Sequence, residues 1–402
     1  MKERKDKTTS MLPRFKVKPF LLPVIVAVGI CASGYYTLAA LERLPDYNVA
    51  LSVATGTGAF ATTGPAVYVP IHIPTPKPVK AIYVTSYVAG VKAWREKMAK
   101  LIDDTELNSI VLDVKDYTGE LVETRAPDIV DYIKQLHEKN IYVIGRVSAF
   151  QDQAYVKAHP ELAVKRKDNG GVWRDRKGIA WLDPGSQEAW DYIVKVSEDA
   201  YAQGFDEINL DYIRFPSDGD MKNVSYTFEN ASSTQVMVMR DFYRYISAKF
   251  HAKGIPVSAD LFGLTTVNKD DLGIGQSLEN ALTYFDYVAP MVYPSHFAPH
   301  FNGWADPNKF AGPLIEYVMG RAVARADALD RLASSTLATS SLTSRFKLRP
   351  WLQDFDYGGN YGEAEVRAQI KGVYDSNLTS WMLWDPGVKY TTSALDKVAT
   401  SS

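Results

Sequence analysis

The sequence has little cysteine and no excess of charge of either sign. Its single cysteine, Cys31, excludes an internal disulfide, so folding does not depend on the redox compartment. Lysine and arginine number 45 against 47 aspartate and glutamate, and a formal net charge of −2 gives no reason to expect a nucleic acid as partner. The 402 residues, 46% of them hydrophobic, suffice for one large globular domain with additions or for two domains.

Several catalytic signatures are also missing. The chain contains no His-Glu-x-x-His zinc motif, no Ser nucleophile elbow and no P-loop. Residues 85–90, after the first predicted strand, are not a Gly-rich phosphate loop, which removes support for an open doubly wound sheet. A metal site from Asp113, Asp116 and His296 is conceivable, but their spacing matches no metal motif. We therefore expect neither a cofactor nor a metal.

The N-terminal part of the chain has the pattern of a membrane anchor. Residues 1–18 are mostly basic, and residues 19–40 are almost wholly apolar and long enough to cross a bilayer as a helix. The positive-inside rule then puts residues 1–18 in the cytoplasm and the rest of the chain outside the membrane. A signal peptide cleaved after Leu38-Ala-Ala40, which would release a secreted protein, is the alternative. Residues 41–79, rich in Thr, Gly, Ala and Pro, are predicted to form a linker.

From residue 80 to 395, short β-rich runs alternate with amphipathic helical stretches. The runs lie at 81–86, 109–114, 141–148, 207–213, 256–262, 287–293, 348–354 and 381–385. The helical stretches include 91–102, 126–139, 187–203, 234–253 and 363–376. A strand followed by a helix, repeated around a ring, predicts an α/β fold, the (β/α)8 TIM barrel.

Three connections are longer than a barrel requires. The longest, 149–186, follows the third strand and therefore lies on the face of the barrel that carries the chemistry. Another, 294–313, follows the sixth strand. The segment 327–346 precedes the seventh strand, so we expect it on the opposite face as a plain connection.

The stretch 205–216 carries the strongest functional signal. Its residues alternate, so Ile208 and Leu210 would pack on the surrounding helices while Asn209 and Asp211 face the barrel axis. Asp211 lies at the carboxyl end of this strand, where TIM barrels hold their catalytic residues. We expect Asp211 to be catalytic.

Other carboxylates end neighbouring strands. The same alternation turns Asp113 and Asp260 inward, together with Lys115, which would tune Asp113 or bind substrate. Asp356 and Asp385 lie one step further out. Crowded carboxylates raise one another's pKa, which allows one of them to act as a general acid beside an ionised neighbour.

Paired carboxylates on a barrel rim indicate glycoside hydrolysis, which needs one carboxylic acid and a second group that acts as nucleophile or base. Aromatic residues make up 12% of the chain, which suits a site that stacks on sugar rings, although each ring could instead fill the core. The further candidates for substrate contact are Arg146, Trp181, Arg214, Tyr293, His296 and Trp384.

Several motifs also resemble those of a known family. The strongest are Glu207-Ile-Asn-Leu-Asp-Tyr-Ile-Arg-Phe-Pro216, Ala289-Pro-Met-Val-Tyr-Pro294 and Trp384-Asp-Pro386. On these the chain resembles, over residues 80–392, a bacterial family of glycoside-hydrolase-like TIM barrels long catalogued as a domain of unknown function. The resemblance implies a barrel and a sugar-related role.

Related barrels suggest roles for the carboxylates. By analogy with barrels of the α-amylase type, Asp211 would be the nucleophile and Asp260 the acid. Other retaining barrels use the fourth and seventh strands, which would bring in Asp354 or Asp356.

We therefore expect a membrane-anchored, extracytoplasmic barrel that hydrolyses a cell-envelope or extracellular polysaccharide. Its partners would be that polysaccharide and, through the N-terminal helix, the membrane. The alternative is a non-catalytic glycan-binding or envelope scaffold protein built on the same barrel.

Overall fold

The computed structural model describes residues 68–228, 233–336 and 344–398. The chain divides into two units, residues 1–66 and 67–402, and every described residue belongs to the second. The predicted basic segment, anchor or signal helix and most of the linker lie outside the described residues. No helix among the described residues combines the length and the hydropathy that a bilayer span requires.

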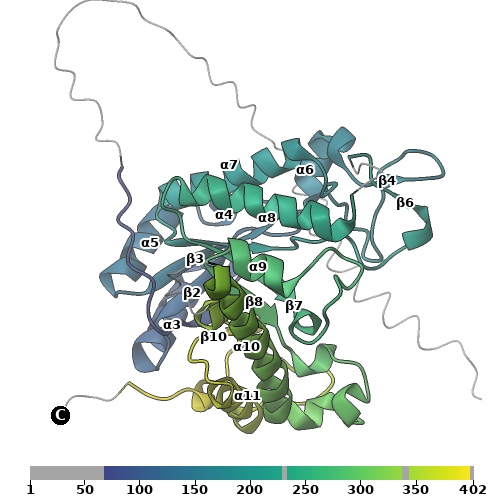
Figure 1. Ribbon diagram of the computed structural model, residues 1–402. Coiled ribbons are helices and arrows are strands. Elements are labelled where there is room, and N and C mark those ends of the chain that lie inside the picture. Colours follow the sequence, from purple (N-terminus) through teal and green to yellow (C-terminus); the bar gives the residue numbers. More distant parts are fainter. Residues whose placement is uncertain (1–67, 229–232, 337–343, 399–402) are drawn as a thin grey trace, which may run out of the picture. The chain divides into compact units, whose positions relative to one another are not determined.

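The second unit is built on a closed barrel of parallel strands (Figure 1). These strands are β1 (Lys80–Val84), β2 (Ser109–Lys115), β3 (Tyr142–Ser148), β5 (Glu207–Asp211), β7 (Val257–Phe262), β8 (Tyr287–Met291), β9 (Trp351–Gln353) and β10 (Trp381–Trp384). Their order around the ring is β1-β10-β9-β8-β7-β5-β3-β2, so the last strand closes on the first. Each strand falls within or overlaps one of the predicted runs, which confirms the TIM-barrel prediction.

Helices surround the ring. The longer ones are α3 (Lys92–Asp104), α5 (Ile129–Glu138), α7 (Gln187–Gln203), α8 (Gln235–His251), α9 (Leu278–Tyr284), α10 (Ala311–Thr336) and α11 (Glu363–Asp375). Shorter ones are α2 (Ser86–Ala89), α4 (Val122–Arg125) and α6 (Gln153–Ala158). In Figure 1, α7 lies beside α8 and α10 lies beside α11, and both pairs are in contact.

The helix ends follow the sequence signals. The N-cap of α7 is Ser186, whose side chain accepts a hydrogen bond from the backbone of Ala189. Its C-cap, Gly204, has φ 115°, a left-handed conformation that glycine adopts without a Cβ clash. Asn140 and Asn377 also end their helices in the left-handed region. These turns deliver the chain from the helix directly into the next strand.

The prediction of a plain connection at 327–346 is wrong for its first half, because α10 continues to Thr336. Buried Leu314, Val318 and Ala322 recur on one side of this helix, at the spacing of an amphipathic helix. The Ala-rich residues that follow are good helix formers. Composition suggested a loop, but the same alanines also favour a helix.

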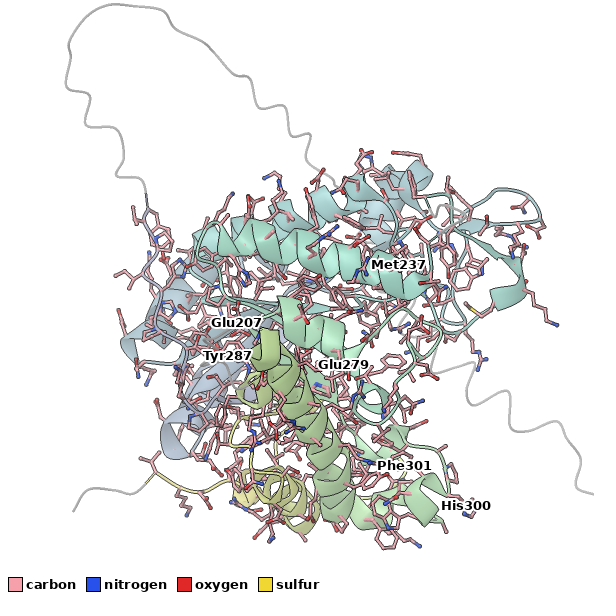
Figure 2. All side chains as sticks on the ribbon, viewed as in Figure 1. Glu207, Met237, Glu279, Tyr287, His300 and Phe301 are labelled. Carbon is pink, nitrogen blue, oxygen red and sulfur yellow. The ribbon has the colours of Figure 1, made fainter. Side chains whose placement is uncertain are left out.

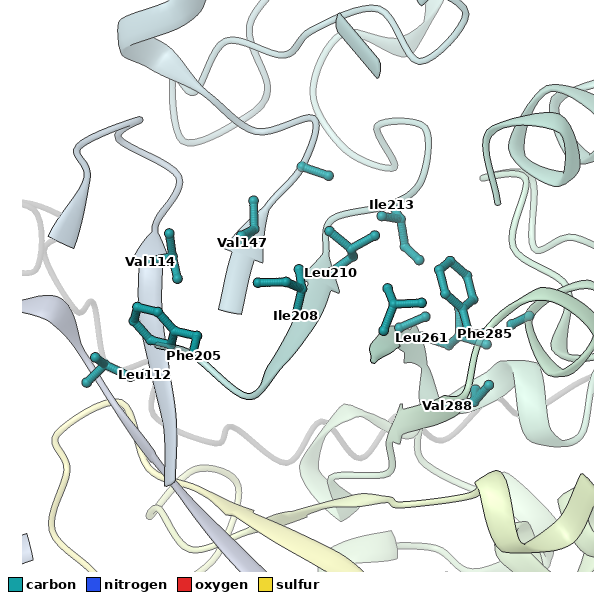
Figure 3. Close-up of a cluster of buried hydrophobic side chains, with 14 of the residues drawn as sticks. Leu112, Val114, Val147, Phe205, Ile208, Leu210, Ile213, Leu261, Phe285 and Val288 are labelled. Carbon is teal, nitrogen blue, oxygen red and sulfur yellow. The ribbon is translucent and has the colours of Figure 1, made fainter. Parts of the chain in front are cut away.

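The alternation along β5 divides the interior into two environments. Ile208 and Leu210 lie in the large apolar cluster between the strands and the helices, where Figure 3 shows them beside Leu261. Val111 of β2 belongs to a second cluster together with Trp351, inside the ring. The predicted inward and outward faces of β2 and β5 are therefore confirmed for these residues.

A buried ion pair is formed at the amino end of β5. Glu207 Oε1 accepts hydrogen bonds from Arg349 Nη2 at 2.6 Å and from Ser258 Oγ at 2.5 Å. Tyr142 donates to the other carboxylate oxygen at 3.1 Å. The Arg349 guanidinium also lies 3.8 Å from the centre of the Tyr287 ring, and Glu207 and Tyr287 are labelled in Figure 2. These side chains lie at the amino end of the barrel, which we call its floor. Their hydrogen bonds connect β3, β5 and β7 with Arg349, in the segment that leads into β9.

Replacing Glu207 by Gln should destabilise the fold, because Arg349 would be left buried without a counter-charge. We expect the free energy of unfolding to fall by about 3–5 kcal/mol. Urea unfolding measures the change. As a control, Lys195→Ala removes an exposed pair with Asp199 and should cost less than about 0.5 kcal/mol. An equal loss of unfolding free energy in the two variants would contradict a stabilising role for the Glu207–Arg349 pair.

Candidate active site

Four charged side chains meet at the carboxyl ends of consecutive strands. Asp113 comes from β2, Arg146 from β3, Asp211 from β5 and Asp260 from β7. The four strands are neighbours in the ring, so their ends lie on one side of the barrel mouth. The four residues are only 1%, 5%, 6% and 1% exposed, so each charge must be compensated within the protein.

Arg146 compensates two of the carboxylates. Its Nη1 donates to Asp113 Oδ1 at 2.6 Å, while Nη2 and Nε donate to Asp211 Oδ2 at 2.5 and 3.2 Å. Tyr83 donates its hydroxyl proton to the second oxygen of Asp113 at 2.5 Å. One guanidinium therefore holds the carboxylates of β2 and β5 in fixed positions.

No cation donates a hydrogen bond to Asp260 among the residues that the structure describes. Its Oδ1 accepts hydrogen bonds from Asn209 Nδ2 at 2.9 Å and from Trp351 Nε1 at 2.8 Å, both neutral donors. Burial and, next, the negative charge of Asp211 raise the pKa of Asp260 to about 8. Asp260 is therefore protonated at neutral pH, whereas its neighbour Asp211 is paired with Arg146. Acid-assisted hydrolysis requires a carboxyl group that keeps its proton in this way.

Aromatic side chains border these carboxylates. Tyr293 is buried, and its pKa is raised by burial and by the charges of Asp260 and Asp211. His296 and Phe355 each contact the edge or face of the Tyr293 ring, and the exposed Tyr357 continues the row beyond His296. We name Tyr293, His296, Phe355 and Tyr357 the aromatic wall.

Trp384, at the end of β10, lies on the other side of the charged group. It stacks on Tyr83 at 3.9 Å between ring centres and meets Trp351 edge-on at 5.4 Å. The Arg146 guanidinium is 5.2 Å from its ring. Trp384 keeps part of its surface exposed, so it combines contact with the charged group and access to the mouth.

The model of a family described as "Putative glycosyl hydrolase domain" matches residues 81–390. The chain belongs to this family. No curated protein matches the sequence. The glycosyl hydrolase family model covers the whole ring of strands, so the resemblance inferred from the strand motifs is confirmed.

Solved structures extend the comparison. The glycoside hydrolase domain of PgaB (BpsB) from Bordetella bronchiseptica is 14% identical, covers 79% of this chain and 99% of its own, and has a TM-score of 0.54, which shows a shared fold. A hypothetical protein from Ruminiclostridium thermocellum is 30% identical over 48% of this chain and 98% of its own, with a TM-score of 0.41. An α-galactosidase from Thermus thermophilus is 12% identical, covers 79% of this chain and 60% of its own, and has a TM-score of 0.47.

The Lys115 side chain does not join the carboxylates at the barrel mouth. It has no exposed surface, and its ammonium pairs with Asp152 at 2.5 Å instead of with Asp113. A register shift between Asp113 and Lys115, where β2 pairs with β3, rotates the end of the strand away from strict alternation. The expectation that Lys115 tunes Asp113 is therefore corrected.

Other predicted residues hold loops in place. Trp181 belongs to the long connection 149–186, is fully buried, and donates its indole N–H to Asp175 Oδ2 at 3.0 Å. It therefore packs in the core and holds this connection in place. Asp356 accepts from the backbone of Tyr361 at 2.7 Å. Asp385 caps its own turn by accepting from the backbone of Gly387 and Lys389 at 2.7 and 3.0 Å.

Asp354, the seventh-strand alternative, is tied to the C-terminal segment. It accepts hydrogen bonds from the backbone N–H and the hydroxyl of Thr391 at 2.9 and 2.6 Å. Burial raises its pKa to about 6. The hydrogen bonds that fix Asp354 therefore differ from those that fix the group around Arg146.

Sequence reasoning missed Tyr212. Its backbone N–H donates to Asp211 Oδ1 at 2.6 Å, and its φ of 53° is left-handed, which is rare for a bulky residue. No glycine or asparagine marks this turn, so the sequence carries no signal for it. Strain of this kind is found at functional sites, and here it orients the carboxylate of Asp211.

Metal ligation was the alternative considered for Asp113, Asp116 and His296. Across the described ranges, no group of three or more His, Cys, Asp or Glu residues converges closely enough to hold a metal ion. Asp116 instead accepts from the backbone of Thr118 at 2.8 Å and stabilises its own turn.

The raised pKa of Asp260 predicts a pH-dependent effect of Asp260→Asn. Between about pH 4 and pH 8 the folded state holds a proton that the unfolded state has released, so wild-type stability falls as pH rises through this window. Asn does not ionise, and it keeps an oxygen for Asn209 and Trp351. The free energy of unfolding of the variant relative to wild type should therefore be higher at about pH 8 than at about pH 5.

Urea unfolding at both pH values measures this difference. Asp199→Asn, on the exposed surface of α7, is the matched control and should show no comparable change with pH. A relative stability of Asp260→Asn that is constant or falls with rising pH would contradict the protonated state of Asp260.

Proposed function

We propose that this barrel hydrolyses a cell-envelope or extracellular polysaccharide, with Asp260 as general acid and Asp211 as nucleophile or base. The observation that carries the proposal is the pairing of a protonated carboxyl with a carboxylate held by Arg146 at one barrel mouth. Glycoside hydrolysis requires these two states at the same time, one to protonate the leaving oxygen and one to attack the sugar or activate water.

The hydrogen bonds of Asp260 favour proton donation. Asn209 and Trp351 both donate to Oδ1, whereas Oδ2 accepts no hydrogen bond from any residue that the structure describes. The acidic proton therefore resides on Oδ2. From there it can pass to a glycosidic oxygen without breaking a bond to the protein.

The hydrogen bonds of Asp211 favour the opposite role. Oδ1 accepts from the backbone of Tyr212 and Oδ2 accepts from Arg146. Both donors stabilise negative charge and restrict rotation of the carboxylate. Such fixed orientation lowers the cost of reaching the transition state.

The aromatic wall and Trp384 supply the flat apolar surfaces on which sugar rings stack. The proposed setting follows from the sequence. An anchor at residues 19–40 would hold the barrel outside the cytoplasmic membrane, near envelope polysaccharides, and cleavage of the same segment would release it.

Each carboxylate substitution should abolish turnover. Asp211→Asn and Asp260→Asn should each lower kcat/KM by at least about 100-fold, because each removes a group that moves charge or a proton in the transition state. Release of reducing sugar from a glycan panel by the full-length chain measures this. Circular dichroism checks that the variants fold, and Asp199→Asn serves as the control.

Unchanged sugar release by Asp211→Asn would refute its assignment. Binding of a glycan by wild type with no cleavage of any panel member would instead favour the non-catalytic scaffold.

The pH profile of wild type should report the acid. Because Asp260 acts only when protonated, kcat/KM should be retained below about pH 8 and fall as pH rises through that value. Initial rates between about pH 5 and pH 10 test this. A rate that rises through pH 8 would exclude Asp260 as the acid.

A further inference from the structure

Arg214 is a buried cation without a carboxylate partner. It lies three residues after Asp211, in the loop on the catalytic side of the barrel, and is 8% exposed. Its Nη1 donates to the carbonyl of Phe215 at 3.0 Å and to Ser217 Oγ at 3.2 Å. Its Nε and Nη2 donate to no residue that the structure describes, and no ion pair to Arg214 is formed within those ranges.

Aromatic rings enclose the guanidinium instead. Its carbon lies 4.9 Å from the ring centre of Trp181, 5.5 Å from that of Tyr212 and 4.6 Å from that of Phe262. Burial lowers the pKa of Arg214 from its ordinary value, but an arginine remains charged at neutral pH. Ring faces offset only part of the desolvation cost of a guanidinium, and Asp211, Asp218 and Asp175 act on it through their charges without forming an ion pair within the described residues, so an anionic ligand can still bind at its free edge.

We propose that Arg214 binds the carboxylate of an acidic sugar beside the scissile bond, which makes the substrate a uronic-acid-containing polysaccharide. This inference rests on the proposed function and specifies its substrate class. The free Nε and Nη2 form the side of the guanidinium that grips both oxygens of a carboxylate in parallel hydrogen bonds.

The position of Arg214 joins this anion site to the reacting groups. Tyr212 presents its ring to Arg214 and its backbone N–H to Asp211, so one residue separates the two sites. Phe262, on the far side of the guanidinium, ends the strand that carries Asp260. A sugar placed between the two catalytic carboxylates would therefore bring a ring substituent toward Arg214.

The loop above the site carries matching charge. Residues 165–178 contain six basic residues against two acidic ones, although the whole chain is slightly acidic. This segment packs through Asp175 against Trp181, the ring that contacts Arg214. A local positive field of this kind raises the concentration of anionic polymers at the mouth.

The other buried arginines near the barrel axis are already neutralised. Arg146 pairs with Asp113 and Asp211, and Arg349 pairs with Glu207 on the floor. Among the buried arginines described, Arg214 is thus the one that a substrate can neutralise.

Binding to matched sugars tests the proposal. The full-length chain carrying Asp260→Asn, which blocks cleavage, is titrated with oligosaccharides of galacturonate, glucuronate and mannuronate and with their carboxyl-reduced, neutral counterparts. We expect at least one uronate to bind about 10- to 100-fold more tightly than its neutral counterpart, the range for charge-assisted hydrogen bonds.

Adding Arg214→Gln should remove that preference, so that the acidic sugar and its neutral counterpart bind with equal affinity. Arg214→Lys should retain only part of it, because the ammonium lacks the planar two-pronged edge. The exposed Arg244→Gln, on α8, is the control and should leave the preference intact. Thermal unfolding of each variant checks that the fold is kept.

Two results would overturn the proposal. One is equal affinity for acidic and neutral sugars, or a preference that survives Arg214→Gln. The other is binding of a sulfated neutral oligosaccharide without binding of any of the three uronates, which would assign the site to a different anion.

The hydrolase proposal fails separately. Uronate binding that depends on Arg214, with no cleavage of the bound sugar by wild type, would support the anion site alone. Cleavage of neutral glycans unaffected by Arg214→Gln would support the hydrolase alone.

Discussion

The candidate site depends on one buried guanidinium shared between two carboxylates. Arg146 stands on β3, between the strands that carry Asp113 and Asp211, and donates to both. Moving a carboxylate from water into the protein interior costs free energy. Hydrogen bonds from Arg146 offset that cost for Asp113 and again for Asp211. No cation donates a hydrogen bond to Asp260 within the described residues, and burial together with the negative charge of Asp211 raises its pKa to about 8. Two similar aspartates at one barrel mouth therefore differ in their partners, because Asp211 is paired with a guanidinium and Asp260 is held by neutral donors.

The closed ring makes this arrangement possible. Parallel strands place their carboxyl ends together, and pleating turns every second side chain toward the axis. Residues separated by almost a hundred positions therefore meet, as Asp113 and Asp211 do through Arg146. On the floor, the same geometry joins Glu207 and Arg349 in a pair that serves packing alone. The barrel thus uses similar buried ion pairs for stability at one end and for the candidate site at the other.

Arg146 and Arg214 illustrate how the surroundings of a charge indicate its role. Both are buried near the barrel mouth, and both lie against aromatic rings. Arg146 has acids on two sides and is a positioning residue for them. Arg214 donates hydrogen bonds only to a carbonyl and a hydroxyl among the described residues, and the nearby Asp211, Asp218 and Asp175 act on it without pairing with it, so one edge of its guanidinium is left for a ligand. The fold shared with the PgaB glycoside hydrolase domain does not reveal this difference, because it depends on individual loop residues.

Local sequence patterns were sufficient to predict the barrel fold and the inward direction of its main carboxylates. Strand–helix repetition predicted the barrel, and alternation along the strands turned Asp113, Asp211 and Asp260 toward one mouth, because secondary structure and pleat parity are local properties of the chain. Parity failed at Lys115, where a register shift with β3 reverses the direction of the side chain. Composition failed at α10, where an alanine-rich segment was predicted as a connection although alanine favours a helix.

Only the tertiary structure decided which charges meet. The contacts of Arg146, the neutral donors around Asp260, the left-handed turn at Tyr212 and the unpaired edge of Arg214 all join residues that are distant in sequence or depend on a strained backbone. The sequence by itself determined a ring of parallel strands with acids at its mouth. The protonation states and the free cation were decided by folding, because burial and Coulomb interactions act through distances in space rather than along the chain.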